Sequence, residues 1–122
     1  MMGEEPADQF HAAGALAEFP AEGGKSVKLN GWHVLIARVG KDFVAINDRC
    51  SHAASPLSPG RIRLGIVMCP LHGARFELAS GKSVDGANRP VRSFPVRIID
   101  GWIEVAVPNA LPGMDECPII RS

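Results

Sequence analysis

Short apolar runs separated by turn-forming residues dominate the chain. "KSVKL" is followed by Asn30-Gly31 and then by "WHVLIARV", and "GKD" separates that run from "FVAI". Asn-Gly between two β-branched runs favours a tight hairpin, because both turn residues must adopt positive φ. "PVRIID" and "GWIEVAV" repeat the pattern around Asp100-Gly101. The pattern therefore predicts two β-hairpins.

Two shorter runs predict further strands: "GIVM" before Cys69 and "RFEL" after His72, with Ser80-Gly81 as a turn. The 13 glycines and 10 prolines interrupt helices throughout the 122 residues, and the one short helical candidate lies around Pro20 to Gly23. Strands of this length with regular turns favour an all-β sandwich or barrel. The proline-containing tail from Pro108 is expected to lie over the surface or to be loose.

Composition narrows the class of protein. The 13 basic residues equal the 13 acidic ones, without the basic stripe typical of a nucleic-acid binder. No apolar run approaches the roughly 20 residues of a membrane span, and the acidic start "MMGEEPADQF" is unlike a secretory signal. We therefore expect a single cytoplasmic domain over 1–122 that binds neither nucleic acid nor membrane. In a reducing cytoplasm, cysteines serve metals or catalysis more often than disulfides.

The segment "CSHAASPLSPGRIRLGIVMCPLH" contains two Cys/His pairs, Cys50 with His52 and Cys69 with His72. Sixteen residues separate His52 from Cys69, and loops of that length in a compact domain are usually functional. Two thiolates and two imidazoles fit either tetrahedral zinc or a 2Fe–2S cluster with both histidines on one iron. Zinc fingers usually group Cys with Cys and His with His, so the alternating order favours the cluster.

The spacing Cys50-x-His52 followed by Cys69-x-x-His72 matches the Rieske signature. The stretches "FVAINDRCSHAASPLSPGRI", "VMCPLHGARFELASGK" and "RPVRSFPVRIIDGWIEV" also resemble the small Rieske ferredoxins of bacterial aromatic-ring dioxygenases. This resemblance runs from about residue 10 to residue 107. It implies one Rieske-type [2Fe-2S] cluster bound by these four residues.

The resemblance also implies a fold. A Rieske protein has a β-sandwich base and a small cluster-binding lobe, which we place at about 47–81, with the base formed by the rest. A third loop shields the cluster in such proteins, and "GANRPV" at 86–91 is similar to it. The segment 108–122 is then a C-terminal tail on a single Rieske domain.

Departures from the respiratory branch of the family indicate a low reduction potential. Rieske proteins of cytochrome bc complexes carry a disulfide between their ligand loops, but the matching residues here are Ser55 and Leu71. The same branch has a serine and a tyrosine that donate hydrogen bonds to sulfur, where this chain has Ala74 and Phe76. Because such donors favour the reduced state, we expect a potential near the lower end of the roughly −150 to +300 mV range.

The implied function is one-electron transfer, without catalysis, from a NAD(P)H-dependent flavin reductase to a terminal ring-hydroxylating oxygenase. Two thiolates neutralise one iron, so the electron should reside on the histidine-bound iron, close to partners. Small or apolar residues near the histidines would form a transient docking tip on a monomer, or simply pack the loops: Ala53, Ala54, Pro56 and Leu71. The alternative is the small Rieske-like subunit of an assimilatory nitrite reductase. The presence of all four ligands favours the ferredoxin.

The remaining candidate residues are interpreted structurally. His33 is expected to be a surface or packing histidine, and His11 to lie near an unanchored N-terminus. Cys117 is expected to be an unpaired thiol in the tail. Trp32 and Trp102, each just after a hairpin turn, are expected to pack in the base rather than to carry electrons. "ASGKS" at 79–83 lacks the first glycine of a phosphate-binding loop and is interpreted as a turn.

Overall fold

The computed structural model describes residues 8–20, 23–51, 54–71 and 73–118. They form strands joined by short turns, with one turn of 3-10 helix, η1, at Leu16–Glu18. The strands are β1 (Asp8–Ala15), β2 (Gly24–Leu29), β3 (Trp32–Val39), β4 (Asp42–Asn47), β5 (Arg61–Arg63), β6 (Ile66–Met68), β7 (Arg75–Glu77), β8 (Ser93–Phe94), β9 (Val96–Ile99) and β10 (Trp102–Pro108).

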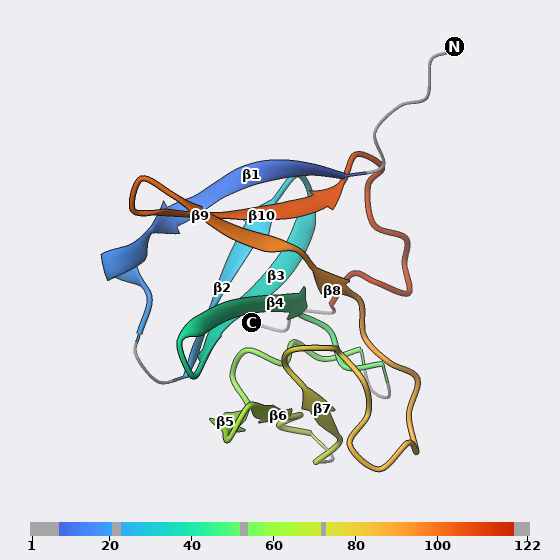
Figure 1. The fold of residues 1–122 in the computed structure, drawn as a ribbon. Coiled ribbons are helices and arrows are strands. Elements are labelled where there is room, and N and C mark those ends of the chain that lie inside the picture. The colour runs from blue at the N-terminus through green and yellow to red at the C-terminus, as the bar shows by residue number, and fades with distance from the viewer. Residues whose placement is uncertain (1–7, 21–22, 52–53, 72, 119–122) are drawn as a thin grey trace.

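The strands form three antiparallel sheets, and the all-β prediction is confirmed. Their orders are β1-β10-β9, β2-β3-β4-β8 and β5-β6-β7. In Figure 1 the β2-β3-β4-β8 sheet lies between the β1-β10-β9 sheet above and the small β5-β6-β7 sheet below. Cys50 lies between β4 and β5, and Cys69 lies between β6 and β7, in segments that adjoin strands of the small sheet.

Both predicted hairpins are present. Asn30 and Gly31 have φ of 49° and 85° between β2 and β3, and Asp100 and Gly101 have φ of 50° and 81° between β9 and β10. Asn, Asp and Gly are the residues that accept positive φ most easily. The turn chemistry thus explains why these four strands pair in this register.

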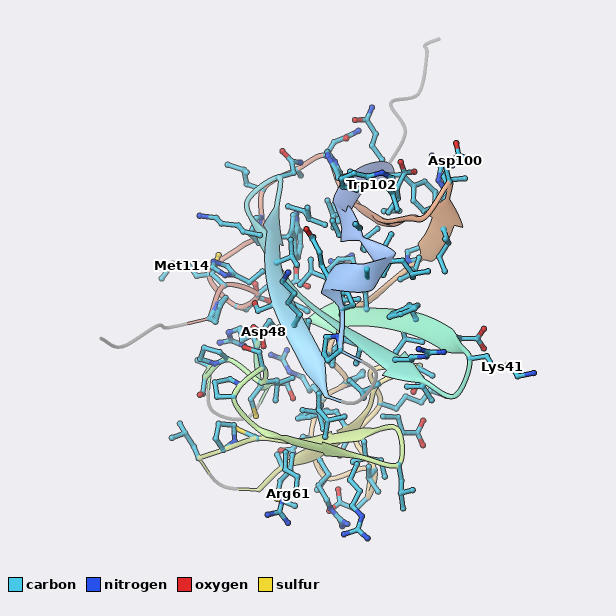
Figure 2. All side chains as sticks on the ribbon, turned by 90° about the vertical axis from the view of Figure 1, so that its left-hand side faces the viewer. Lys41, Asp48, Arg61, Asp100, Trp102 and Met114 are labelled. Carbon is cyan, nitrogen blue, oxygen red and sulfur yellow. The ribbon has the colours of Figure 1, made fainter. Side chains whose placement is uncertain are left out.

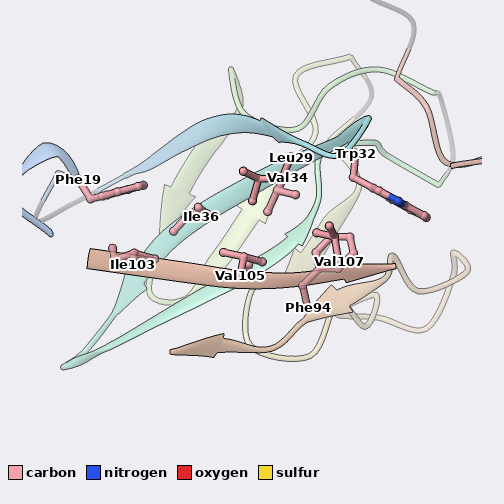
Figure 3. Close-up of a cluster of buried hydrophobic side chains, with 10 residues drawn as sticks. Phe19, Leu29, Trp32, Val34, Ile36, Phe94, Ile103, Val105 and Val107 are labelled. Carbon is pink, nitrogen blue, oxygen red and sulfur yellow. The ribbon is translucent and has the colours of Figure 1, made fainter. Parts of the chain in front are cut away.

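Strand β3 is buried on both faces, which links the base to the small sheet. Its side chains alternate in direction: Val34 and Ile36 pack with Val105 in the base core (Figure 3). Leu35 belongs instead to a second core, which contains Cys50 and Cys69. That second core consists of Leu35, Ala37, Ile46, Cys50, Leu57, Val67, Cys69, Phe76, Leu78 and Val91. The central sheet therefore supports the cysteine-containing segments directly.

The N-terminal part corrects two expectations. The segment around His11 is not unanchored, because β1 pairs with β10 from Asp8 to Ala15. The helical turn lies at Leu16–Glu18, whereas Pro20 is not helical and Gly23 lies in a bend. An alanine- and glycine-rich strand gives no alternating apolar pattern, and backbone pairing with β10 stabilises it instead.

The C-terminal tail lies on the surface. The Trp32 indole N–H donates to the Ala110 carbonyl at 2.9 Å, and the Asn30 side-chain amide donates to the Pro108 carbonyl at 3.0 Å. Trp32 is buried in the base core as expected. Trp102, in contrast, is 49% exposed on β10, so the expectation that it packs in the base is wrong. Among the described residues, no helix is long and apolar enough to cross a membrane.

Candidate metal centre

The first candidate ligand, Cys50, lies just after β4 in a closed loop. Its N–H donates to the Ser55 carbonyl at 2.8 Å, and its carbonyl accepts from the Ala54 N–H at 3.0 Å. Ala54 has φ of 59°, which turns the chain back towards Cys50. Cys50 is 0% exposed. The predicted ligand His52 and the neighbouring Ala53 lie outside the described residues.

The second loop has the same hydrogen-bond pattern. The Cys69 N–H donates to the Ala74 carbonyl at 2.7 Å, and the Cys69 carbonyl accepts from the Gly73 N–H at 3.0 Å. Gly73 has φ of 77°, matching the position of Ala54 in the first loop. Cys69 is 1% exposed, and the predicted ligand His72 lies outside the described residues.

The two loops are thus equivalent: a buried cysteine begins each turn, and the fourth residue after it has positive φ. Both cysteines belong to one buried cluster, with Leu57 and Phe76 around them. Two buried thiols on matched loops fit a centre that takes one thiolate from each loop. Within the described ranges, which leave out His52 and His72, no three metal-ligating side chains lie close enough together to hold a metal ion.

A buried carboxylate, which sequence analysis missed, supports the first loop. Asp48 is 2% exposed, and its Oδ1 accepts from the N–H groups of Leu57 and Ser58, both at 2.7 Å. The Ser26 hydroxyl donates to its Oδ2 at 2.8 Å. Asp48 therefore joins the end of β4, strand β2 and the far end of the segment that begins at Cys50. The only signal in the sequence is an Asp where strand β4 ends, which is also an ordinary turn residue.

The predicted third loop lies against the first ligand loop. The Ser51 hydroxyl donates to the Arg89 carbonyl at 2.5 Å. The Val91 N–H donates to the Gly81 carbonyl at 2.8 Å, and a Cβ at Gly81 would lie 2.1 Å from the Val91 oxygen. Only glycine permits that approach, so Gly81 fixes how closely the 86–91 segment packs. The turn predicted at Ser80-Gly81 begins earlier than expected and covers residues 78–80.

The tail extends to the same region. The Asn47 amide donates to the Glu116 carbonyl at 3.0 Å, and the Arg49 guanidinium donates to the Cys117 carbonyl at 3.2 Å. An ion pair of 2.8 Å joins Arg92 to Glu116. The tail thereby braces the end of β4, immediately before Cys50. The Cys117 thiol is partly buried and forms no disulfide within the described residues.

The remaining predicted positions are distributed around the two loops. Phe76 is fully buried and Ala74 packs against the same core, so both lie near the cysteines. Leu71 is 57% exposed, whereas Ala54 and Pro56 are partly buried. Leu71 is thus the most accessible apolar residue of the predicted tip among those described.

The positive φ of Ala54 allows a matched test. L-residues with a Cβ are strained in the left-handed region by about 1–2 kcal/mol, so Ala54→Gly should raise the free energy of unfolding by about 0.5–1 kcal/mol after the extra entropy of glycine is counted. Ala87→Gly, at an exposed residue without positive φ, should lower it instead. Denaturant titration of the two variants measures the change in the free energy of unfolding, which should be positive for Ala54→Gly and negative for Ala87→Gly. An equal loss of stability in both would show that Ala54 is unstrained.

Comparison of the sequence and the fold with known proteins shows the family of this chain. The family model described as the Rieske [2Fe-2S] domain matches residues 9–95. The chain belongs to this family. The anthranilate 1,2-dioxygenase ferredoxin subunit of Burkholderia cepacia is 33% identical over 107 residues, covering 87% of this chain and 99% of the relative. The 3-phenylpropionate/cinnamic acid dioxygenase ferredoxin subunit of Escherichia coli K12 is 40% identical over 81 residues, covering 65% and 76%.

Solved structures agree with the Rieske fold. The ferredoxin in a complex with the reduced oxygenase of carbazole 1,9a-dioxygenase superposes with a TM-score of 0.75 at 26% identity, covering 84% of this chain and 97% of that one. The small subunit of an NADH-dependent nitrite reductase from Mycobacterium tuberculosis gives 0.73 at 24% identity, covering 84% and 97%. This Rieske protein has a [2Fe-2S] cluster as its cofactor and acts as an electron carrier.

Proposed function

We propose that this Rieske protein is the ferredoxin component of a ring-hydroxylating dioxygenase system, and that Cys50, His52, Cys69 and His72 bind its cluster. The observation that carries the proposal is the pair of equivalent loops, each with a buried cysteine at its start. Each loop also carries one histidine in the sequence, two or three residues after the cysteine. The dioxygenase ferredoxin subunits at 33% and 40% identity support the same role.

The chain's own residues would supply binding and access. When bound, a [2Fe-2S] cluster accepts and releases one electron. Cys50 and Cys69 would hold it from inside the second core, where water is excluded. Leu71, which adjoins His72 and is 57% exposed, would lie at the docking tip. Brief contacts through a small surface suit a carrier that must leave each partner after one electron.

The partners follow from this role. The reduced carrier would donate its electron to a terminal ring-hydroxylating oxygenase, after receiving it from a NAD(P)H-dependent flavin reductase. We infer a monomer that works in the cytoplasm and forms no product itself. We infer that the reductase is a separate protein, because the relatives at 33% and 40% identity are ferredoxin subunits of dioxygenases.

The nitrite reductase alternative is less well supported. Its structural neighbour is 24% identical, a level that indicates the shared fold alone. The two curated relatives described above, at 33% and 40% identity, are ferredoxin subunits of dioxygenases. This difference favours a dioxygenase system over a nitrite reductase as the setting in which the protein acts.

The test measures the cluster and its electron in separate steps. Protein prepared under argon should contain two irons and two sulfides per chain, matching the [2Fe-2S] composition of its family. NADH alone should leave it oxidised, and NADH with a dioxygenase flavin reductase should reduce it. Stopped-flow mixing with purified oxygenases, beginning with that of anthranilate 1,2-dioxygenase, should then reoxidise it. Reoxidation by a nitrite reductase catalytic subunit, and by none of the oxygenases, would reverse the assignment.

The proposed site also predicts how the potential can be raised. Ala74→Ser combined with Phe76→Tyr would place hydroxyl donors beside the cysteines, and donors to sulfur favour the reduced state. We expect the double variant to have a potential higher by tens of millivolts, where about 59 mV corresponds to a tenfold change in a one-electron equilibrium. Phe43→Tyr, at a partly buried residue that packs against the base core, is the control and should leave the potential unchanged. An equal potential in wild type and double variant, with the cluster retained, would refute this explanation.

A further inference from the structure

One hairpin turn departs from the chain's own pattern. Two-residue turns with positive φ at both positions join β2 to β3, β5 to β6 and β9 to β10. The first residue is Asn30 in one and Asp100 in another, but it is Leu64 between β5 and β6. Leu64 has φ of 54° and its side chain is 89% exposed. A leucine with positive φ strains the backbone, and its exposed apolar side chain lowers solubility. Both costs indicate that the residue has a function.

Arginines surround this leucine on one sheet face. Side chains of directly paired residues lie on the same face of a sheet, and Arg61 pairs with Met68, which pairs with Arg75. Arg63 lies two residues from Arg61 and therefore on the same face. Figure 2 shows Arg61 at the end of the molecule opposite Asp100 and Trp102.

These side chains line a shallow groove of about 270 Å³. Its lining, here named the basic face, consists of Arg61, Arg63, Leu64, Ile66, Met68 and Arg75.

The basic face has an excess of positive charge. The ion pairs recorded among the described residues join Arg92 to Glu116 and Arg97 to Glu104, both outside this face. Glu77 shares the face through its pairing with Ile66.

A second acidic group, Asp85, lies close enough to Arg75 to interact with it. The pKa of Asp85 is held below its usual range first by the Ala87 N–H, then by the Ser83 hydroxyl, with a smaller contribution from the Arg75 charge. Asp85 therefore offsets Arg75 in part and leaves Arg61 and Arg63 as the stronger positive charges.

The face adjoins the proposed cluster site. Met68 immediately precedes Cys69, and its Sδ lies 4.0 Å from the position of a Cβ on Gly73 in the second ligand loop. A protein seated on the groove would therefore contact the backbone that leads into that loop. A partner docked on this face would therefore lie close to the proposed cluster, as electron transfer requires.

We propose that the basic face is a docking surface for an acidic protein surface on the terminal oxygenase, with Leu64 as its apolar anchor. The proposal rests on the proposed function, since it names a contact of the same carrier. Docking is reversible and forms no covalent bond. In the docked complex one electron passes from the reduced carrier to the oxygenase, so the carrier is oxidised and the oxygenase is reduced. Charge complementarity would mainly speed the encounter, as expected for charges around an interface.

A protein fits this face better than a membrane or a nucleic acid. The whole chain has a formal net charge of zero, unlike the strongly basic domains that bind phosphate backbones. One exposed leucine also provides far less apolar area than the continuous apolar stripe of a membrane-surface helix. Binding to anionic vesicles is therefore an outcome that would contradict the proposal.

The experiment measures reoxidation of the reduced carrier by the oxygenase that accepts electrons best from the wild type. Arg61→Glu should lower the second-order rate constant about tenfold at low ionic strength, with most of the loss disappearing in ~0.5 M salt, where charges are screened within a few ångströms. Lys28→Glu, on β2, changes the net charge equally and should have little effect. The potentials of all variants should match the wild type.

Leu64→Asn is the second test variant, because it should weaken docking while making the folded protein more stable. It introduces the asparagine found in the β2–β3 turn, a residue that accepts positive φ more easily than leucine, so its thermal midpoint should rise by a few degrees. Its rate constant with the oxygenase should nevertheless fall severalfold. Unchanged rates in both Arg61→Glu and Leu64→Asn would overturn the proposal, as would binding of the wild type to vesicles of phosphatidylglycerol and phosphatidylcholine. A wild type that reduces no oxygenase would instead remove the proposed function.

Discussion

Replacing His72 by alanine is expected to yield protein without its two irons and two sulfides, whereas His33→Ala should retain both. In the proposed site, His72 and His52 would together hold one iron, and that iron would be open to water and hydrolysis if only one imidazole remained. His33 lies in β3, and only its backbone carbonyl contributes to the site region, accepting from the Asp48 N–H at 2.8 Å. Iron and sulfide assays with the visible spectrum measure the difference.

A third variant distinguishes ligand loss from misfolding. His72→Cys keeps a ligand at the position but exchanges a neutral imidazole for a thiolate. Added negative charge disfavours the reduced state, so this variant should keep a cluster at a lower potential. Because metal binding and local folding are coupled, the alanine variant should also be cleaved faster in the segments around Cys69. Equal iron content in His72→Ala and His33→Ala would remove His72 from the ligand set.

Local turn chemistry explains what could be predicted of the fold. Asn30-Gly31 and Asp100-Gly101 specify positive φ within two residues, and both hairpins form there. The turn between β5 and β6 was not predicted, because Leu64 is not a turn-forming residue. Its conformation depends on the pairing of the two strands and on Gly65. The sequence thus predicts a turn well only where the residue type and the backbone agree.

Long-range pairing explains most of what was missed. The strand β1 has few β-branched residues and is stabilised by pairing with β10, almost a hundred residues later in the chain. The two-residue strand β8 is likewise held by pairing with β4, which lies far earlier in the chain. The candidate ligands were predicted because their spacing is local. Asp48 was missed because its acceptor role depends on N–H groups nine and ten residues away and on Ser26.

Replacing the buried carboxylate of Asp48 by alanine is expected to lower the free energy of unfolding and to speed the release of iron. Asp48→Ala removes the acceptor of the Leu57 and Ser58 N–H groups, and Leu57 is fully buried. A buried donor left unsatisfied costs about 1–3 kcal/mol. The two donors together should therefore lower the free energy of unfolding by about 3 kcal/mol. The segment that begins at Cys50 would then no longer be held at Leu57 and Ser58. Iron should therefore also be released faster to a chelator.

Asp48→Asn separates hydrogen bonding from charge. Its side-chain carbonyl can accept from both N–H groups, and its amide can donate to the Ser26 hydroxyl in place of the bond that Oδ2 now accepts. Stability should fall by about 1 kcal/mol or less. Loss of a negative charge two residues before Cys50 should raise the potential, because the reduced state carries one more electron. Asp48→Ala therefore tests the support of the loop, and Asp48→Asn tests the charge.

Two further variants decide whether Asp48 acts through its position. Asp42→Ala removes an exposed carboxylate at the other end of β4 and should change neither stability nor iron release measurably. Ser26→Ala removes the hydroxyl bond to Oδ2 but leaves both bonds to Oδ1, so its loss should be intermediate, about 1 kcal/mol. The expected order of iron release is Asp48→Ala, then Ser26→Ala, then Asp42→Ala. If Asp48→Ala released iron no faster than Asp42→Ala, the carboxylate would stabilise the fold without positioning the ligand loop.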